Sequence, residues 1–508
     1  MKARAIQICG TGSGVGKSVI VSALCRIFLQ DGYKVCPFKA QNMALNSFVT
    51  RQGGEIGRAQ ATQALACRIE PHVDMNPVLL KPASDTGAQV IVRGSPLGNM
   101  NARNYTRYKA KLLPVVRRSF DALSKKYEAV VIEGAGSPAE INLKSHDIVN
   151  IKMARYAKAP VILVGDIDKG GVFASLVGTL ELLNNSERRM IKGFIINKFR
   201  GDKTLLVPGL RWLEKRTGIK VLGVIPYFRG ISIPEEDAVP LDNFTARPSE
   251  RKRRKLDIAV IYLPHISNFT DFDPLAAEPD VKLRYVNRPE GLGKPDMLII
   301  PGTKSTITDL SYLNKSGFAG KILENANSKK HSVILGICGG YQIMGEIIYD
   351  KHAIESGSRK VKGLGLLPVS TRLMPHKELN RLKAKDTASG EEVSGYEIHH
   401  GLTKSAGNCK PFFEVFQRNG KEVKYPDGIA CKGRRVLGTY IHGLFDSAAF
   451  RRDFLNRLRA KKGWPALSQE TTFNPDAEID KLAKLARENI DTAYLYRILD
   501  KNIQEVIR

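Results

Sequence analysis

The first 240 residues alternate short, continuous apolar runs with segments of helical length. Apolarity that is continuous rather than alternating is typical of parallel strands covered by helices on both faces. The pattern therefore predicts a doubly wound α/β domain, in which ligands bind at the carboxyl ends of the strands. The predicted strands are residues 5–9 (AIQIC), 34–38 (KVCPF), 129–133 (AVVIE), 160–165 (PVILVG), 193–197 (GFIIN) and 221–226 (VLGVIP).

A second α/β pattern follows a polar stretch that contains the basic run RKRRK. We predict an N-terminal domain at residues 1–241, a basic linker at 242–255, a second domain at 256–450 and a helical segment at 451–508. The apolar runs of the second domain are DIAVIYLP (257–264), DMLIIPG (296–302), SVILGICGG (332–340), GYEIHHG (395–401) and VLGTYIHGLF (436–445).

Length and composition agree with this division. A chain of 508 residues is too long for one hydrophobic core, so two or three domains are expected. No apolar run is long enough to cross a bilayer, and the N-terminus enters a strand and a glycine loop without a signal-peptide pattern. We therefore expect a cytoplasmic enzyme.

The seven cysteines include no C-x-x-C pair, which favours neither a zinc knuckle nor a disulfide framework. Most of them are expected to be small buried side chains. Only Cys338 has neighbours that indicate chemistry.

Lys plus Arg exceed Asp plus Glu by 79 to 51, a formal charge of +28. Such a surplus attracts polyanions, including substrates with several carboxylates or phosphates. A basic surface that serves only solubility is the alternative. Because no nucleic-acid-binding motif accompanies the basic run, nucleic acid is not an expected partner. A membrane is not expected as a partner either.

The sequence CGTGSGVGKS lies between a predicted strand and a predicted helix. In such a loop, backbone N–H groups surround phosphates, a lysine neutralises their oxygens and a hydroxyl can hold Mg²⁺. Five residues separate the outer glycines of this loop, one more than in the common P-loop. The predicted ATP-binding residues here are Gly12, Gly14, Val15, Gly16, Lys17 and Ser18.

Other polar residues end the predicted strands of the same domain. Glu133 ends AVVIE, where it is placed to hold the metal together with Ser18; an ordinary turn residue is the alternative. Asn197 ends GFIIN and is a candidate for nucleotide binding. Lys39, Asp166 and Asp168 are candidates for contact with a phosphoryl group or an acidic substrate, although Lys39 could equally be a solvated surface lysine.

The stretch GICGG has the G-x-nucleophile-x-G form of a sharp strand-to-helix turn. Such a turn exposes the Cys338 thiol beside backbone N–H groups that can form an oxyanion hole. A thiol nucleophile needs a base, and His442 follows a strand-like run. His399, His400 and Glu397 are weaker candidates, and a structural role for His442 is the alternative.

These motifs carry a resemblance to known families. The second domain resembles the class I (triad-type) glutamine amidotransferases in GICGGYQIMG and YIHG. The first domain is similar to the dethiobiotin-synthetase-like group of P-loop enzymes, whose loop has the longer spacing. Together with FKAQNMALNS, EGAGSPAEINL, GDIDKGGVFA, INKFRGD, LPHISNFTDFDPL, PGTKSTITDL and GYEIHHG, the chain resembles the cobyric acid synthase family over residues 1 to about 450.

The resemblance implies that ATP, with Mg²⁺ held by Ser18 and Glu133, phosphorylates a substrate carboxylate. Ammonia released from glutamine at Cys338, with His442 as base, then displaces the phosphate. In the family the substrate is adenosylcobyrinic acid a,c-diamide, amidated on four peripheral propionates (b, d, e and g) in cobalamin synthesis. The implied partners are thus small molecules, and no tightly bound organic cofactor is expected.

One position departs from the triad pattern. The usual glutamate two residues after the histidine is Leu444 here, so Cys338 and His442 could act as a pair, with Glu397 or another group orienting the imidazole. An amidotransferase acting on another acid, such as the acetates of cobyrinic acid or a cell-wall precursor, stays open. A P-loop ATPase switch of the partitioning type is a more distant alternative, since a switch has no use for the thiol turn.

Overall fold

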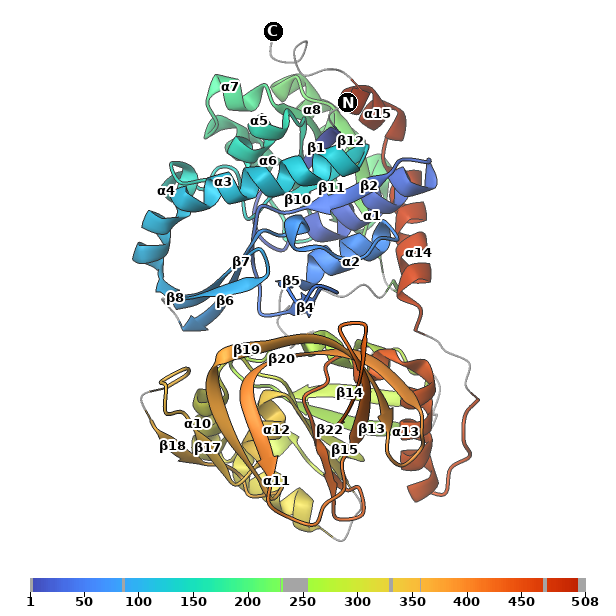
Figure 1. Cartoon of the computed structure of the whole chain (residues 1–508). Coiled ribbons are helices and arrows are strands. Elements are labelled where there is room, and N and C mark those ends of the chain that lie inside the picture. Colours follow the sequence, from blue (N-terminus) through green and yellow to red (C-terminus); the bar gives the residue numbers. More distant parts are fainter. Residues whose placement is uncertain are drawn as a thin grey trace. The chain divides into compact units, whose positions relative to one another are not determined.

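The computed structural model describes residues 3–84, 87–228, 230–231, 255–328, 332–356, 358–468 and 473–500. The chain forms two compact units (Figure 1). The first consists of Met1–Ala44, Ile56–Glu236 and Asn474–Arg508, and the second of Leu45–Glu55 and Asp237–Phe473. The predicted basic linker at 242–255 lies almost wholly outside the described residues.

A six-stranded parallel sheet forms the centre of the first unit. All its strands begin and end within about two residues of the runs predicted from apolarity, because most of these residues are buried. The doubly wound parallel fold is confirmed. In spatial order the strands are β12 (Val221–Pro226), β11 (Ile191–Phe199), β10 (Val161–Asp166), β1 (Arg4–Gly10), β9 (Ala129–Glu133) and β2 (Val35–Phe38).

Helices and a small second sheet complete this unit (Figure 1). The small sheet has the order β3 (Gln41–Met43), β6 (Val78–Ser84), β7 (Gly87–Val92) and β8 (Ser95–Asn101). The helices are α1 (Lys17–Gln30), α2 (Arg58–Ala66), α3 (Ala102–Lys126), α4 (Ile141–Lys144), α5 (Ile151–Ala157), α6 (Val172–Glu181), α7 (Asn185–Arg188), α8 (Lys203–Thr217), α14 (Pro475–Asn489) and α15 (Thr492–Asp500), with the 3₁₀ turn η1 (Val73–Met75).

The second unit also has a central sheet that is parallel except at one edge. Its strands are β14 (Val281–Val286), β13 (Leu256–Ile261), β15 (Met297–Ile300), β16 (Val333–Ile337), β24 (Val436–Thr439) and the antiparallel β23 (Ile429–Cys431). The helices are α9 (Asp273–Ala276), α10 (Thr306–Ser316), α11 (Phe318–Asn327), α12 (Gly339–Met344) and α13 (Ala448–Lys461), with 3₁₀ turns η3 (Phe269–Phe272), η4 (Pro289–Gly291) and η5 (Leu444–Asp446).

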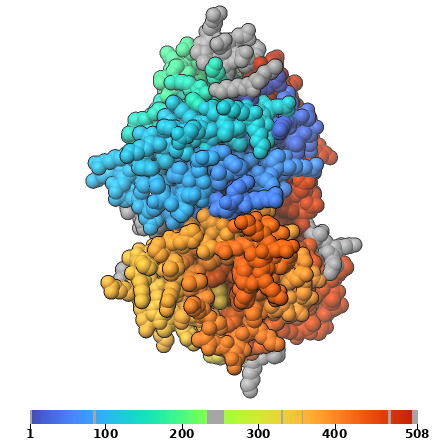
Figure 2. Space-filling model, viewed as in Figure 1, coloured from blue at the N-terminus to red at the C-terminus, as the bar shows by residue number. Residues whose placement is uncertain are grey.

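A largely antiparallel sheet lies beside this core and provides much of the surface of the unit visible in Figure 2, in yellow and orange. It contains β17 (Ile347–Tyr349), β18 (Lys360–Lys362), β19 (Val369–Asp386), β20 (Glu392–Ser405), β21 (Phe413–Arg418) and β22 (Lys421–Asp427). The predicted run 395–401 therefore belongs to the long hairpin β19–β20 and not to the parallel sheet. The short strands β4 (Ser47–Val49) and β5 (Glu55–Gly57) pair with each other.

Two segments group differently from the division expected from the sequence. Residues 45–55 lie in the N-terminal part of the chain but belong to the second unit. The predicted C-terminal segment 451–508 is divided, because α13 packs in the second unit and α14 packs on α1 in the first. The buried Arg26 of α1 pairs there with Asp480 at 2.6 Å.

The cysteine spacing did not indicate a disulfide framework, but the structure forms one disulfide bond. Cys409 and Cys431 are bonded, with their Cα atoms 5.0 Å apart. Lys410 and Ala430 form an antiparallel bridge, which brings the two neighbouring cysteines together. Spacing along the chain could not show this pairing. The free cysteines Cys9, Cys25, Cys36, Cys67 and Cys338 are buried.

Candidate active sites

The glycine loop after β1 has the backbone that its sequence predicts. Gly14 and Gly16 have φ values of 70° and 96°, a region that other residues rarely adopt. A Cβ atom on Gly16 would lie 2.2 Å from Nδ2 of Asn197. That Nδ2 atom donates a hydrogen bond to the carbonyl of Val15 at 2.9 Å, so the end of β11 supports the loop.

Lys17 and Ser18 at the start of α1 contact the glycine loop itself and groups at or after the end of β9. Lys17 Nζ donates to the carbonyl oxygens of Gly12 (2.8 Å) and Gly136 (3.3 Å). Ser18 Oγ donates to Oε1 of Glu133 at 2.8 Å. The structure therefore brings the loop and the strand-end carboxylate together.

Glu133 is fully buried and lies against a cation. Lys39 Nζ is 2.9 Å from Oε1 of Glu133, and Lys39 is itself only 4% exposed, so it is not a solvated surface lysine. Burial raises the pKa of Glu133, but the charge of Lys39 and hydrogen bonds from Lys39, Gln63 and Ser18 lower it further than burial raises it. The carboxylate is thus held ionised. Gln63 lies on α2, and no sequence motif indicated it.

Asp166 and Asp168 follow β10 and have different neighbours. Asp166 is buried and pairs with Lys198 (2.8 Å), which also donates to the carbonyl of Gly14 at 2.7 Å. Asp168 is partly exposed and pairs with Arg200 at 2.6 Å. Asp166 is thereby connected to the phosphate-type loop, whereas Asp168 lies in a surface ion pair.

Cys338 stands at the predicted strand-to-helix turn, between β16 and α12. Its φ and ψ are 52° and −109°, an unusual conformation for a residue with a side chain. The flanking glycines allow the turn to pack closely. A Cβ atom on Gly340 would lie 2.0 Å from the carbonyl oxygen of Ile300, and one on Gly339 would lie 2.6 Å from the side chain of Thr303.

His442 follows β24 and lies beside the thiol. Its Nδ1 is 2.6 Å from Oδ2 of Asp271, in the turn η3, and both side chains are almost wholly buried. Burial lowers the pKa of His442, but the Asp271 carboxylate and a hydrogen bond with the Cys338 thiol raise it to about 10. The arrangement therefore favours a protonated imidazole beside the thiol.

Asp271 was missed in the sequence, where the group that orients His442 was left open between Glu397 and another residue. Asp271 and His442 are 171 positions apart in the sequence, and no spacing rule links the motif NFTDFD to the histidine. The carboxylate of Glu397 instead contacts His399 Nε2 (3.3 Å) and accepts from Asn380 Nδ2 (2.6 Å). Of the two alternatives, the geometry favours another group, because Asp271 is the carboxylate at His442 Nδ1.

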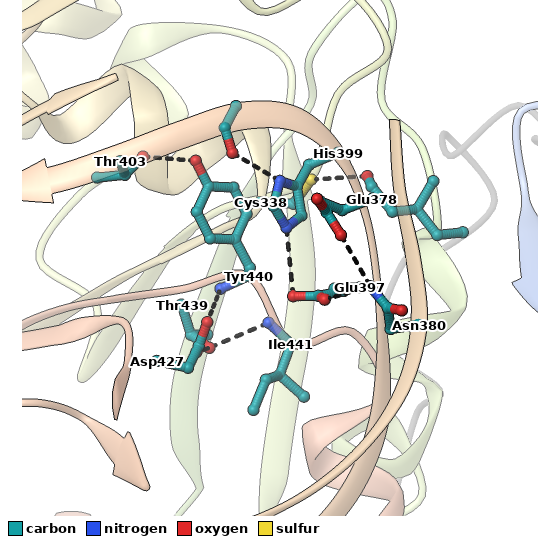
Figure 3. Close-up of polar contacts among 12 residues, drawn as sticks. Cys338, Glu378, Asn380, Glu397, His399, Thr403, Asp427, Thr439, Tyr440 and Ile441 are labelled. Atoms are coloured by element: carbon teal, nitrogen blue, oxygen red, sulfur yellow. Dashed lines mark hydrogen bonds and ion pairs between the residues drawn. The ribbon is translucent and has the colours of Figure 1, made fainter. Parts of the chain in front are cut away.

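Glu397 belongs to a buried polar cluster next to the thiol (Figure 3). His399 stacks on Tyr440 with ring centres 3.7 Å apart, and its Nδ1 faces the carbonyl of Gly401. Cys338 Sγ lies 3.4 Å from the carbonyl oxygen of Ile398, so strand β20 lines the thiol. His399 and Glu397 are close to the nucleophile without touching His442.

His400, the neighbouring weaker candidate, is neutral. Burial, together with the charges of Lys377 and Lys304, lowers the pKa of His400 to about 4. Its Nδ1 faces the carbonyl of Met374 at 3.0 Å. An imidazole with so low a pKa is a weak proton acceptor, so His400 is a poor candidate for the catalytic base.

A thiol, an imidazole and a carboxylate in this order are able to perform acyl transfer through a thioester. The other unit presents a loop of the kind that binds phosphates. Among the described residues, no group of three or more His, Cys, Asp or Glu side chains could hold a metal ion, and no helix is long and apolar enough to span a membrane. Fold and sites together define a glutamine amidotransferase with a nucleotide-binding domain.

Comparison with known proteins supports this class and narrows it. Residues 6–241 match the CobQ/CobB/MinD/ParA nucleotide binding domain, and residues 257–450 match the CobB/CobQ-like glutamine amidotransferase domain. A cobyric acid synthase of Dehalococcoides mccartyi (strain CBDB1) is 50% identical over 99% of this chain and 100% of its own.

Other relatives have the same name and similar coverage. The cobyric acid synthase of Syntrophobacter fumaroxidans is 47% identical over 98% of this chain and 99% of its own, and that of Clostridium kluyveri is 48% identical over 97% and 98%. The chain belongs to the cobyric acid synthase family and is an enzyme. The resemblance and the fold class expected from the sequence are confirmed.

Proposed function

We propose that this enzyme amidates the propionate side chains b, d, e and g of adenosylcobyrinic acid a,c-diamide, using ATP and glutamine, to give adenosylcobyric acid. The single observation that carries the proposal is 50% identity to a cobyric acid synthase along nearly the whole chain. The phosphate-type loop and the buried thiol–imidazole–carboxylate set support it, because the reaction needs a site for each half.

In the first half-reaction, a substrate carboxylate attacks the γ-phosphorus of ATP and becomes an acyl phosphate, with ADP leaving. Activation is needed because a free carboxylate is a poor electrophile. Lys17 neutralises phosphate oxygens, and the backbone N–H groups around Gly14 and Gly16 surround them. Ser18 and Glu133 provide a hydroxyl and an ionised carboxylate, the oxygen donors that Mg²⁺ prefers.

In the second half-reaction, the Cys338 thiolate attacks the side-chain carboxamide of glutamine. His442, protonated on Nε2 and oriented through Nδ1 by Asp271, gives its proton to the departing ammonia. Water then cleaves the thioester to glutamate, with His442 as base. The ammonia attacks the acyl phosphate and displaces inorganic phosphate, which leaves the carboxamide.

The charge and the compartment fit the proposed substrates. A formal charge of +28 favours a corrinoid with several carboxylates. We place the enzyme in the cytoplasm, where ATP is abundant and reduced thiols persist. Because such conditions open disulfides, the enzyme should work without the Cys409–Cys431 bond.

Mass spectrometry of the corrinoid product tests the proposal. Each carboxylate converted to a carboxamide lowers the mass by about 1 Da, because OH is exchanged for NH₂. Incubation with ATP, glutamine and adenosylcobyrinic acid a,c-diamide should give four such steps. Conversion of cobyrinic acid at its acetates instead, with the a,c-diamide untouched, would assign the enzyme to a different acid.

A further inference from the structure

Residues 45–55 form part of the glutaminase unit, although they lie within the range that matches the nucleotide-binding domain. Along the sequence, the residues before and after this segment belong to the first unit. Two residues of the segment bind the start of the turn η3, which contains Asp271. Oδ1 of Asn46 accepts the N–H of Phe269 at 3.2 Å, and the N–H of Ser47 donates to Oδ1 of Asn268 at 2.9 Å.

The same segment supports the His442 ring from a second side. Phe48 packs against Tyr396 with ring centres 5.3 Å apart, and Tyr396 stacks on His442 at 5.4 Å with an angle of 17° between the planes. At the end of the segment, Glu55 and Lys377 form a buried ion pair with N–O separation of 2.5 Å. These contacts anchor the segment within the second unit.

Asn268 lies between this segment and the catalytic histidine. It is 2% exposed, and its φ of 54° is a left-handed conformation that asparagine tolerates better than most residues. Its Nδ2 is 3.5 Å from Nε2 of His442, the nitrogen that faces the thiol.

Ser47 decides which end of the Asn268 amide faces the histidine. A backbone N–H can only donate, so the amide atom beside it must be the oxygen. The amide nitrogen of Asn268 is therefore the atom directed at His442. If the amide were reversed, two donors would face each other at Ser47, in a place closed to water.

We propose that Asn268 is a positioning residue of the glutaminase site and that residues 46–48 hold it, so that glutamine hydrolysis depends on a segment of the nucleotide-binding part of the sequence. The inference rests on the glutaminase half of the proposed function. It is independent of which acid receives the ammonia.

The groups around His442 indicate when Asn268 acts. Asp271 faces Nδ1, the Cys338 thiol and the Asn268 amide face Nε2, and the Tyr396 ring covers one face. When His442 has given its proton to ammonia, Nε2 carries a lone pair that accepts the Asn268 N–H. Asn268 thus holds the neutral ring in place until the attacking water replaces the amide N–H at Nε2 and gives its proton to that nitrogen.

The test is hydrolysis of glutamine by the full-length enzyme, measured as the rate at which glutamate is released. Asn268→Ala should lower kcat about tenfold, the value of one hydrogen bond, while KM for glutamine changes less than about twofold. Synthesis with free ammonia should be unchanged. Asn325→Ala, which removes another buried asparagine of the same unit, should leave both reactions at the wild-type rate.

A second pair of variants tests the segment itself. Phe48→Ala should lower kcat for glutamine several-fold, about the effect of losing one aromatic contact, and again spare the ammonia reaction. Arg51→Ala changes an exposed residue of the same segment and should have no effect. Asn268→Asp retains the size and the acceptor for Ser47 but replaces the donor, so it should lower kcat without lowering the melting temperature.

Wild-type kcat in Asn268→Asp and Asn268→Ala would overturn the proposal. So would an equal loss of the glutamine and ammonia reactions in Phe48→Ala at an unchanged melting temperature, since the segment would then not act on glutamine hydrolysis in particular. Because glutamate release needs no corrinoid, failure of the proposed amidation would appear separately, as a wild-type enzyme that hydrolyses glutamine but leaves the corrinoid mass unchanged.

Discussion

The two sites are both glycine-rich turns between a parallel strand and a helix, but their glycines have opposite roles. In the nucleotide loop, Gly14 and Gly16 themselves adopt positive φ values, which curves the backbone around a ligand. In the thiol turn, Cys338 adopts the positive φ, and Gly339 and Gly340 provide the space that lets it do so. The same residue type builds a binding loop in one case and presents a nucleophile in the other.

The buried charges differ in a similar way. In the first unit a carboxylate, Glu133, is kept ionised by Lys39. In the second unit a histidine, His442, is kept protonated by Asp271. Each ionised group is stabilised by a partner from another element, which costs less than burying it alone. One site is thereby suited to bind a cation and phosphates, and the other to move a proton.

The largest effect is expected for the loop lysine. Lys17→Ala should abolish corrinoid amidation with either glutamine or ammonia, because no acyl phosphate forms without charge neutralisation at the phosphates. Phosphate release from ATP, measured with the corrinoid present, should be lost in parallel. If amidation from ammonia survived in Lys17→Ala, the nucleotide loop would not have the phosphate-binding role that distinguishes it from the thiol turn.

The next largest effect separates the two half-reactions. Cys338→Ser should abolish glutamine-dependent synthesis and glutamate release while leaving synthesis from free ammonia. His442→Ala should behave in the same way. If Cys338→Ser also stopped the ammonia reaction, with normal folding, the thiol would not be confined to glutamine hydrolysis.

A smaller loss is expected at the residue that only the fold revealed. Asp271→Asn should lower kcat for glutamine by about 10³-fold, since the amide no longer favours the imidazolium or its correct tautomer. Wild-type glutaminase activity in Asp271→Asn would mean that a residue other than Asp271 orients His442. The ammonia-dependent reaction serves as the internal control.

The same variant makes a prediction about stability and pH. The pKa of His442 is raised from 6.5 to about 10, so its stabilising effect is complete below pH 6.5 and disappears as the pH rises through 10. Asp271→Asn should lower the free energy of unfolding by about 3 kcal/mol at pH 6, the cost of breaking a buried pair. Denaturant titrations should show this difference shrinking toward pH 10; a constant difference would contradict the assignment.

The smallest effect is expected at Glu397. Because its carboxylate contacts His399 and not the catalytic ring, Glu397→Gln should reduce kcat for glutamine less than about tenfold, the loss of one hydrogen bond. Assayed beside Asp271→Asn, this variant shows which carboxylate serves His442. A larger loss in Glu397→Gln than in Asp271→Asn would reverse that conclusion.

Strands and turns that depend on neighbouring residues could be predicted well. The run 129–133 is the strand β9 to the residue, and 221–226 is β12, because continuous burial leaves a clear apolar signal. The run 436–445 was less successful, since β24 ends at Thr439. Asp427 accepts hydrogen bonds from the Thr439 hydroxyl and the Tyr440 N–H there, and apolarity does not indicate such a stop.

The sequence by itself determined the class of the enzyme and the residues whose motif is local: Lys17, Ser18 and Cys338 each stand in a strand–turn–helix unit that their neighbours encode. Only the tertiary structure decided which carboxylate serves His442, that Lys39 neutralises Glu133, and that residues 45–55 belong to the glutaminase unit. The reason is physical: hydrogen bonds and ion pairs depend on distance in space, and residues that meet through the fold leave no pattern along the chain.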